Sequence, residues 1–203
     1  MNKLLILGAG GHGRVVADVA QRGKAYDEIA FLDDVEPYNV CDYPCLGKCS
    51  DFEKHIDTYE MIVAIGNNAV RRQVTKNLQA KGATLATVIA PDAIIGAGVQ
   101  IGAGTVVLSG SIVNTGSVID EGVLLNTSSV LDHDCRVGAF SHIAVGAKLS
   151  GSVYIGENTW IDAGVAVKPN VRICDNCKVC VGSAVDCDLT ESGIYTGVPA
   201  RKL

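Results

Sequence analysis

Two histidines in the second half of the chain carry the side chains best suited to proton transfer. His133 is followed directly by Asp134, and His142 comes shortly after. An imidazole titrates near neutral pH, and an adjacent carboxylate can orient it and keep it basic. Such a pair suits general-base chemistry, in which a proton leaves an amine or hydroxyl as it attacks a thioester carbonyl. We interpret His133 as the base, Asp134 as its partner, and His142 as a donor to the oxyanion that forms.

A repeat of six residues determines where these side chains stand. Every sixth residue from Ile95 is Ile, Val or Leu, without a break over sixteen successive positions. These positions, called markers below, are Ile95, Ile101, Val107, Val113, Ile119, Leu125, Leu131, Val137, Ile143, Leu149, Ile155, Ile161, Val167, Ile173, Val179 and Val185. A repeat of fixed period indicates a solenoid built from one small structural unit.

Each repeat is expected to form one short strand and one turn. The residue two positions before a marker is small or β-branched, from Ala93 to Ser183. Residues two apart in a strand share a face, so both positions point inward. The residue after the marker is often Gly, Asn or Asp, which suits a corner. Three repeats would make one triangular coil, and about five coils would stack into a β-helix. A β-helix used only as a scaffold or an ice-binding surface is disfavoured by its irregular outward positions.

The residue just before each marker points outward, and these residues sort into three faces. One face is largely polar: Gln100, Val118, Arg136, Tyr154 and Arg172. The other two are largely apolar: Val106, Leu124, His142, Trp160 and Lys178 on one, and Ile112, Val130, Lys148, Ala166 and Ala184 on the other. Apolar outward patches suggest protein contacts, and a threefold ring uses two different surfaces of each subunit, so we predict a homotrimer. The alternative is that the N-terminal domain or the C-terminal tail covers one of these faces.

The two histidines leave this prism in different directions. His133 stands at a corner, and His142 lies on a face of the contact type. They could meet across a subunit boundary, or both could simply be exposed.

The first part of the chain alternates strands with helices, which indicates a parallel α/β sheet. Strands are expected at Lys3–Leu7, Glu28–Leu32 and Glu60–Ile65, with helices over Arg14–Gln21 and Ala69–Ala80. A glycine-rich turn after the first strand lets a phosphate approach a helix N-terminus. Asp33-Asp34 and Gly66 end the other two strands at the same edge, which favours a bound nucleotide over a turn without a ligand. We predict a Rossmann-like domain over residues 1–88 and a β-helix over 89–203.

The cysteines do not suggest a metal site. Cys177 points inward in the repeat, whereas Cys174 and Cys180 fall at successive corners and are not expected to converge. Cys41, Cys45 and Cys49 lie in a segment that is expected to be a loop, and we do not expect them to bind a metal. A zinc hydratase on the same fold would need three converging histidines, and only His133 and His142 lie in the repeat.

Composition excludes several other classes of protein. The net charge is −5 with acids and bases interspersed, which is no footprint for nucleic acid. The apolar stretch at the N-terminus is too short for a signal peptide, and no segment is long and apolar enough for a membrane helix. We expect a soluble cytoplasmic protein whose eight cysteines are reduced.

Several short motifs occur in an order that resembles a known family. They are Gly8–Gly13, Phe31–Asp34, Ala64–Asn68, Asn126–Ser129, His133-Asp134 and Gly197–Ala200. Together they resemble the sugar O-acyltransferase family, which includes sialic acid O-acetyltransferases of the NeuD type and the UDP-4-amino-sugar N-acetyltransferases of bacillosamine synthesis. The resemblance spans nearly the whole chain.

The resemblance implies a left-handed parallel β-helix and a trimer with active sites between adjacent subunits. It implies acetyl-CoA as co-substrate, no metal, and His133 as the base, with Asp134 where relatives carry Glu. Residues implied to hold acetyl-CoA are His142, Gly151, Ala163 and Val181. Residues implied to hold the nucleotide sugar are Gly10, Gly11, His12, Asp33, Asp34, Gly66 and Asn126.

The expected function is N-acetylation of a UDP-4-amino-4,6-dideoxy sugar by acetyl-CoA for surface glycan synthesis. The alternatives are O-acetylation of sialic acid and a non-catalytic protein that binds sugar nucleotides. The intact nucleotide-type N-terminal pocket favours the first of these three.

Overall fold

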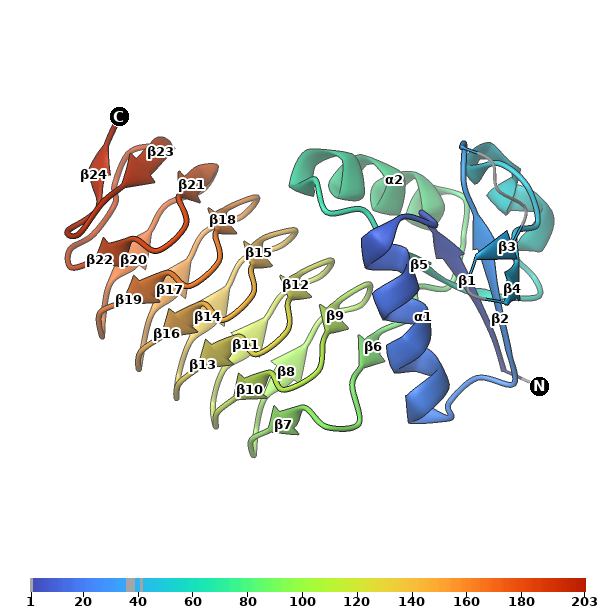
Figure 1. Cartoon of the computed structure of the whole chain (residues 1–203), viewed down its shortest axis with the longest axis horizontal. Coiled ribbons are helices and arrows are strands. Elements are labelled where there is room, and N and C mark those ends of the chain that lie inside the picture. Colours follow the sequence, from blue (N-terminus) through green and yellow to red (C-terminus); the bar gives the residue numbers. More distant parts are fainter. Residues whose placement is uncertain (1, 36–38, 41) are drawn as a thin grey trace. The chain divides into compact units, whose positions relative to one another are not determined.

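The chain folds into two compact units, residues 1–91 and 92–203 (Figure 1). The computed structural model describes residues 2–35, 39–40 and 42–203. The first unit is α/β and the second is a β-helix, so the predicted fold class is confirmed.

The first unit is built on three parallel strands, β1 (Lys3–Leu7), β2 (Glu28–Leu32) and β5 (Glu60–Val63), in the order β2-β1-β5. The strands are apolar because both faces of the sheet are buried. Helix α1 (Gly11–Gly23) follows β1, and α2 (Asn68–Ala80) follows β5. β1 and β2 have the predicted bounds, whereas α1 begins earlier than predicted because its glycines carry no helical periodicity.

Helices and strands of the first unit share a core on each face of the sheet. On one face, Leu5 and Leu32 pack with Phe52 and Leu78 of the following segments. On the other face, α1 approaches the sheet at Gly13, where a methyl group would lie 3.3 Å from the ring of Phe31. This close packing holds the turn between β1 and α1 in a fixed position.

The segment from Asp34 to Asp57, which the sequence left unassigned, contains three short elements. They are strands β3 (Asn39–Val40) and β4 (Tyr43–Pro44), paired antiparallel, and a 3₁₀ helix over Cys49–His55. Strand β6 (Val88–Ile89) ends the first unit. Cys41 lies outside the described residues.

The second unit is a stack of coils with three sheets, whose strands are parallel except for the last pair at the C-terminal end of the third sheet, which is antiparallel (Figure 1). The first sheet has the strand order β7 (Ile94–Ile95), β10 (Ile112–Val113), β13 (Val130–Leu131), β16 (Lys148–Leu149), β19 (Ala166–Val167) and β22 (Ala184–Val185). The second has β8 (Gln100–Ile101), β11 (Val118–Ile119), β14 (Arg136–Val137), β17 (Tyr154–Ile155) and β20 (Arg172–Ile173). The third includes β9 (Val106–Val107), β12 (Leu124–Leu125), β15 (His142–Ile143), β18 (Trp160–Ile161), β21 (Cys177–Val179), β23 (Gly193–Thr196) and β24 (Arg201–Lys202). We call these the first, second and third sheets.

The core of the β-helix is formed by the two inward positions of each repeat. The markers from Val107 to Val185 are buried, as predicted. The smaller inward residues that carry hydroxyls use them to tie adjacent coils together. Ser117 Oγ, for example, donates to the carbonyl of Asp132 at 3.1 Å, and Ser141 Oγ donates to that of Gly156 at 2.7 Å. A buried hydroxyl is therefore satisfied without water.

The corners have a left-handed backbone at one fixed position. Every sixth residue from Gly98 to Gly182 has a positive φ, and these residues include Ser128, Asp134 and Asn158. This position lies two residues beyond the residue after the marker, so the corner extends over several residues. The glycines directly after the markers are needed because adjacent coils approach closely there. A methyl group on Gly138 would lie 2.7 Å from the backbone N of Glu157 in the next coil.

Candidate active site

His133 stands at the corner between β13 and β14, where the first and second sheets meet. Its carbonyl accepts the N–H of Ser152 at 2.8 Å, and the N–H of Asp134 donates to Thr115 O at 3.0 Å. Both neighbouring coils therefore hold this corner. The side chain of His133 is 53% exposed, so it projects out of the prism as expected for a corner residue.

The carboxylate of Asp134 orients the His133 ring. His133 Nδ1 lies 2.8 Å from Asp134 Oδ2, so the Asp side chain is long enough to reach the ring. Asp134 has a φ of 59°, and this left-handed backbone places its side chain beside the preceding residue. A carboxylate accepts only, so Nδ1 carries the hydrogen and Nε2 has a lone pair. The hydrogen bond that His133 donates to Asp134, followed by the charge of Asp132, raises the pKa of His133 above its usual 6.5.

Gly151 lies directly beside the imidazole, in the next coil. A methyl group at this residue would stand 2.5 Å from His133 Nε2 and 2.7 Å from Cε1. Gly151 is buried and is not among the positive-φ residues. The absence of a side chain at this residue therefore makes room for the histidine, which is a role that the sequence did not suggest.

His142 lies on β15 of the third sheet and is 6% exposed. Its Nε2 is 3.2 Å from Asn126 Nδ2, and the amide oxygen of Asn126 accepts the N–H of Thr127 at 2.8 Å. Because that backbone bond fixes the amide, Nδ2 donates to His142 Nε2, and the ring hydrogen lies on Nδ1. The ring of Trp160 packs against His142, with 4.8 Å between the centroids.

The residues predicted to act in catalysis and acetyl-CoA binding fall into two groups within one chain. His133, Asp134 and Gly151 lie where the first sheet meets the second. The other group lies on the third sheet and at its corner with the first sheet: Asn126, His142, Ala163 and Val181. Val181 is 68% exposed in the single chain, as is expected of a residue that contacts a ligand or another subunit. The first sheet separates these two groups.

The glycines of the turns after β1 and β5 are of two kinds. A methyl group on Gly13 would lie 1.9 Å from Gly8 O, so Gly13 is required by the packing of α1. In contrast, a methyl group on Gly10 or Gly66 would meet no atom within 4 Å, and one on Gly11 would only reach an Arg14 nitrogen at 4.0 Å. The fold does not need small residues at these three positions. They leave backbone open to a ligand at the carboxyl edge of the sheet.

His12 and the two aspartates lie around this turn. Burial, and then the charge of Arg71, lower the pKa of His12 to about 4, so the ring is neutral near pH 7. Its Nε2 is buried and has no hydrogen-bond partner among the described residues. Asp33 accepts the N–H of Ala9 at 2.5 Å and that of Val35 at 2.8 Å, and Asp34 accepts that of Cys49 at 3.0 Å. Asp33 thus anchors the turn after β1 through these two hydrogen bonds.

Arg71 is a residue of this edge that the sequence analysis missed. It lies on α2 and is 2% exposed. Its guanidinium donates to Ile65 O at 3.0 Å, to Gly66 O at 3.1 Å and to Asn68 Oδ1 at 2.9 Å. It therefore fixes the loop after β5 and places a positive charge near the turn, where an anionic ligand would be favoured.

The low pKa of His12 predicts that the first unit is sensitive to acid. The unfolded chain binds a proton at this residue near pH 6.5, whereas the folded chain binds it near pH 4. Stability is therefore lost as the pH falls through this window, by up to about 3 kcal/mol. Urea unfolding at about pH 7 and about pH 4.5 should show a smaller difference for His12→Gln than for the wild type. The matched change His55→Gln should leave the difference unaltered; equal pH dependence for His12→Gln would contradict the assignment.

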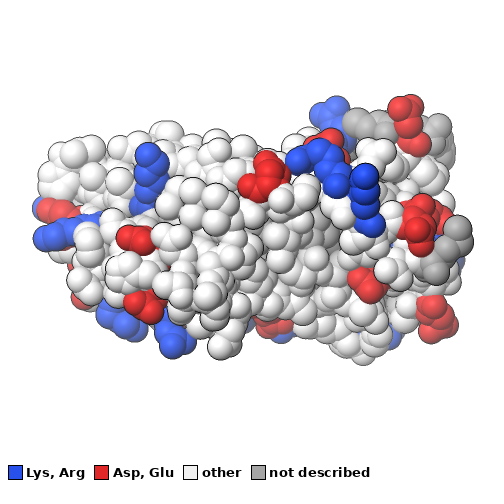
Figure 2. All heavy atoms as spheres, turned by 90° about the horizontal axis from the view of Figure 1, so that it is seen from below, with Lys and Arg blue, Asp and Glu red and all other residues white. Residues whose placement is uncertain are grey.

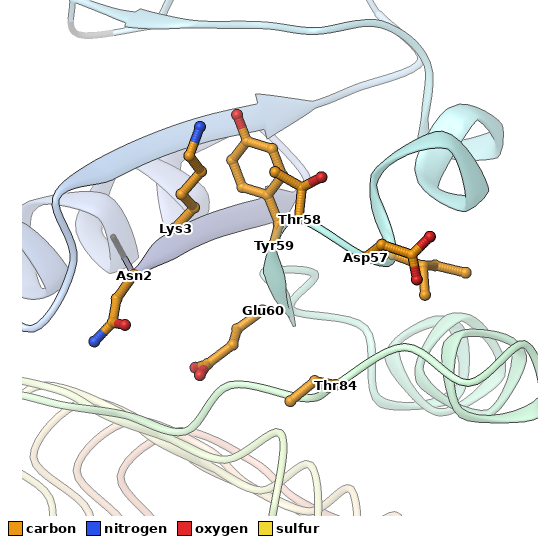
Figure 3. Close-up of a pocket in the computed structure, with 8 residues that line it drawn as sticks. Asn2, Lys3, Asp57, Thr58, Tyr59, Glu60 and Thr84 are labelled. Atoms are coloured by element: carbon orange, nitrogen blue, oxygen red, sulfur yellow. The ribbon is translucent and has the colours of Figure 1, made fainter.

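A pocket of about 220 Å³ lies at the opposite edge of the sheet (Figure 3). Lys3 and Glu60, at the amino ends of β1 and β5, line it together with Tyr59. Lys3 Nζ pairs with Glu28 at 2.6 Å and lies 5.4 Å from the centre of the Tyr59 ring. Glu60 accepts the hydroxyl of Tyr26 at 3.0 Å, so both Lys3 and Glu60 have partners outside the pocket, which is distinct from the glycine-rich turn.

The cysteines of the C-terminal coils are closer together than expected. Cys174 Sγ lies 3.5 Å from Cys177 Sγ, a contact that the repeat did not indicate, whereas the expectation that Cys174 and Cys180 do not converge stays a prediction. The corner bends the Cys174 side chain back towards the inward-pointing Cys177. Within residues 2–35, 39–40 and 42–203, no group of three or more His, Cys, Asp or Glu is placed to hold a metal ion.

Two further properties concern the surface and the helices. Acidic and basic side chains are interspersed on the face in Figure 2, so neither sign dominates it. Among the described residues, neither helix has the length and apolar character required to cross a bilayer.

A hexapeptide β-helix with a carboxylate-held corner histidine, together with a nucleotide-type α/β unit, defines the class of hexapeptide acyltransferases. The family models agree: residues 3–78 match the PglD N-terminal domain, and 152–186 match the bacterial transferase hexapeptide (six repeats).

Solved structures extend the similarity to the full chain. The acetyltransferase domain of PglB from Neisseria gonorrhoeae, solved in complex with acetyl coenzyme A, is 38% identical with a TM-score of 0.97, and all of both chains is covered. PerB from Caulobacter crescentus, in complex with CoA and GDP-perosamine, is 31% identical with a TM-score of 0.91, over 99% of this chain and 97% of that one. A GDP-perosamine N-acetyltransferase from Escherichia coli O157:H7 is 27% identical, over 84% of this chain and 80% of its own length. The chain belongs to the PglD-type family of hexapeptide-repeat sugar acetyltransferases.

Proposed function

We propose that the chain transfers an acetyl group from acetyl-CoA to the amino group of a nucleotide-linked 4-amino-4,6-dideoxy sugar, with UDP as the nucleotide. The observation that carries this proposal is the His133–Asp134 pair, whose free Nε2 faces outward from a β-helix corner. The relatives solved with acetyl-CoA, or with CoA and GDP-perosamine, support both substrates as classes.

His133 acts as the general base in this proposal. Its Nε2 accepts a proton from the sugar amine as the amine attacks the thioester carbonyl, and Asp134 stabilises the imidazolium. His142, with its tautomer fixed by Asn126, polarises the carbonyl, and CoA leaves as the tetrahedral intermediate collapses. Gly151 keeps space for the imidazole and lies where acetyl-CoA approaches it, while Ala163 and Val181 contact the cofactor further along.

The nucleotide binds at the carboxyl edge of the first unit. Gly10, Gly11 and Gly66 leave room for the diphosphate, which their backbone N–H groups and the charge of Arg71 stabilise. His12 and Asp34 bind the remaining polar groups. Asp33, which already holds Ala9, contributes as an anchor of the turn.

The site is completed by a second chain. The first sheet separates the His133 group from the His142 group. Each chain therefore contributes its His133 group to one site and its His142 group to another. A ring of three chains brings the His133 corner of one subunit to the His142 side of the next. The proposal is therefore a homotrimer with three equivalent sites.

A panel of acceptors tests the proposed reaction. Purified protein with acetyl-CoA should acetylate a UDP-4-amino-4,6-dideoxy sugar with a higher kcat/KM than GDP-perosamine or sialic acid. GDP-perosamine is the second candidate because one relative named for it and another solved in complex with it match most of the chain. Transfer to GDP-perosamine with a higher kcat/KM would contradict the choice of nucleotide, and transfer only to sialic acid would contradict N-acetylation itself.

A further inference from the structure

Asp132, the residue before His133, is held in place from three directions. Its Oδ1 accepts the N–H of His133 at 2.8 Å and the side-chain amide of Asn114 at 3.0 Å. Its carbonyl accepts Ser117 Oγ, and its N–H donates to Leu149 O in the next coil at 2.9 Å. The backbone of Asp132 is therefore held by both neighbouring coils, and its side chain, which Asn114 orders, accepts a hydrogen bond from the peptide of the histidine.

The same bond at two other corners shows that a charge is not needed to make it. Asn126 accepts the N–H of Thr127 at 2.8 Å, and Asp162 accepts that of Ala163 at 2.8 Å. An amide oxygen and a carboxylate oxygen thus serve this corner equally well. The corner bond therefore does not account for the negative charge of Asp132. The residue directly beside this charge is His133.

We propose that Asp132 is a positioning residue for the base: it fixes the peptide of His133 at the corner and provides a second carboxylate beside the imidazolium. The inference rests on the proposed function, since it assigns Asp132 a task in the same proton transfer. It acts through His133 and does not touch the substrate.

The charges around the imidazole agree with this role. Hydrogen bonds from Asn114 and from the N–H of His133 lower the pKa of Asp132, so it is ionised near neutral pH. The pKa of His133 is raised first by the Asp134 hydrogen bond and then by the charge of Asp132. The coil on one side presents the uncharged Gly151 and Ser152, and the coil on the other presents Thr115. Among the described residues, the two aspartates are the charged groups that raise the pKa of the ring.

Asp132→Asn separates the charge from the corner bond, because Asn126 already shows that an amide can make that bond. The readout is the NMR titration of the His133 ring in the full chain without substrates. The midpoint should move to lower pH in Asp132→Asn, whereas the matched control Asp175→Asn, which loses the same charge at a corner between the second and third sheets where Asp175 accepts the N–H of Glu157 at 2.8 Å, should leave it in place. An unmoved midpoint in Asp132→Asn, or an equal shift in both variants, would overturn the proposal.

Kinetics test the positioning part separately. In Asp132→Asn the acidic limb of the kcat/KM profile should follow the titration to lower pH, with a plateau lowered less than about tenfold because the base is weaker. Asp132→Ala removes the corner bond as well and should lose more in kcat than Asp132→Asn, with KM values unchanged; equal kcat in the two variants would overturn the positioning role. Failure of the proposed acceptor would leave the titration result intact, so the two hypotheses can fail independently.

Discussion

Replacement of His133 by alanine is expected to lower kcat for acetyl transfer by about 100- to 10,000-fold, the usual contribution of a general base. The substitution removes the Nε2 that accepts the amine proton. The ring is 53% exposed and is not part of the core, so the fold should be retained. Steady-state kinetics with acetyl-CoA and the acceptor sugar would show the loss in kcat, with the KM for acetyl-CoA little changed.

The pH profile gives the same residue a second test. Because the Asp134 hydrogen bond raises the pKa of His133, the acidic limb of wild-type kcat/KM should lie above the ordinary histidine value. The control His55→Ala, which changes a histidine of the first unit, should keep both the rate and the limb. Undiminished transfer by His133→Ala would remove this mechanism.

Gly151→Ala is expected to have the second largest effect. The new methyl group would stand 2.5 Å from His133 Nε2, and the exposed ring would have to move away from it. A displacement of about 1 Å at a reacting group costs about a hundredfold in rate, so kcat should fall by about that factor. The backbone of Gly151 has no positive φ, and thermal unfolding should therefore be nearly unchanged.

The kinetic pattern distinguishes two roles for Gly151. Displacement of the base lowers kcat, whereas a role confined to acetyl-CoA binding would raise only the KM for acetyl-CoA. Gly23→Ala, at the exposed end of α1 with no atom within 4 Å of the new methyl group, is the matched control and should be neutral. A normal kcat in Gly151→Ala would show that the imidazole does not need this space.

Much of the fold could be predicted because the buried face of each element repeats with a fixed period. The markers from Val107 to Val185 are buried, and β1 and β2 have the predicted bounds and end where the apolar runs end. Periodicity reports which residues face the core, and it therefore predicts strands well and the conformation of corners poorly. The left-handed backbone of Asp134 illustrates that limit, because the repeat placed His133 and Asp134 at a corner without indicating which of them has a positive φ.

Other features depend on contacts between residues that are far apart in sequence. Arg71 sits in a polar helix and has no sequence signal of its own, yet it is buried where it reaches the carbonyls of Ile65 and Gly66. The contact of Gly151 with His133 joins adjacent coils and needs coordinates to be seen. The approach of Cys174 to Cys177 was missed because the repeat fixes the backbone register and not the side-chain direction.

For the candidate site, sequence and resemblance named the residues, and the structure supplied their grouping. The pairing of His133 with Asp134 was foreseeable from their adjacency. That the other group, with His142 and Asn126, lies beyond the first sheet was foreseeable only in part, from the outward faces. The proposal of a site shared between two chains accounts for this separation.

Mixed oligomers of two inactive variants test that claim most directly. His133→Ala and His142→Ala subunits, co-expressed or refolded together in equal amounts, would place an intact His133 corner beside an intact His142 side at some interfaces. Random assembly into a trimer predicts recovery of about a quarter of the wild-type activity, since one interface in four receives both intact halves. Activity no higher than that of the two variants measured separately would contradict a site built from two chains.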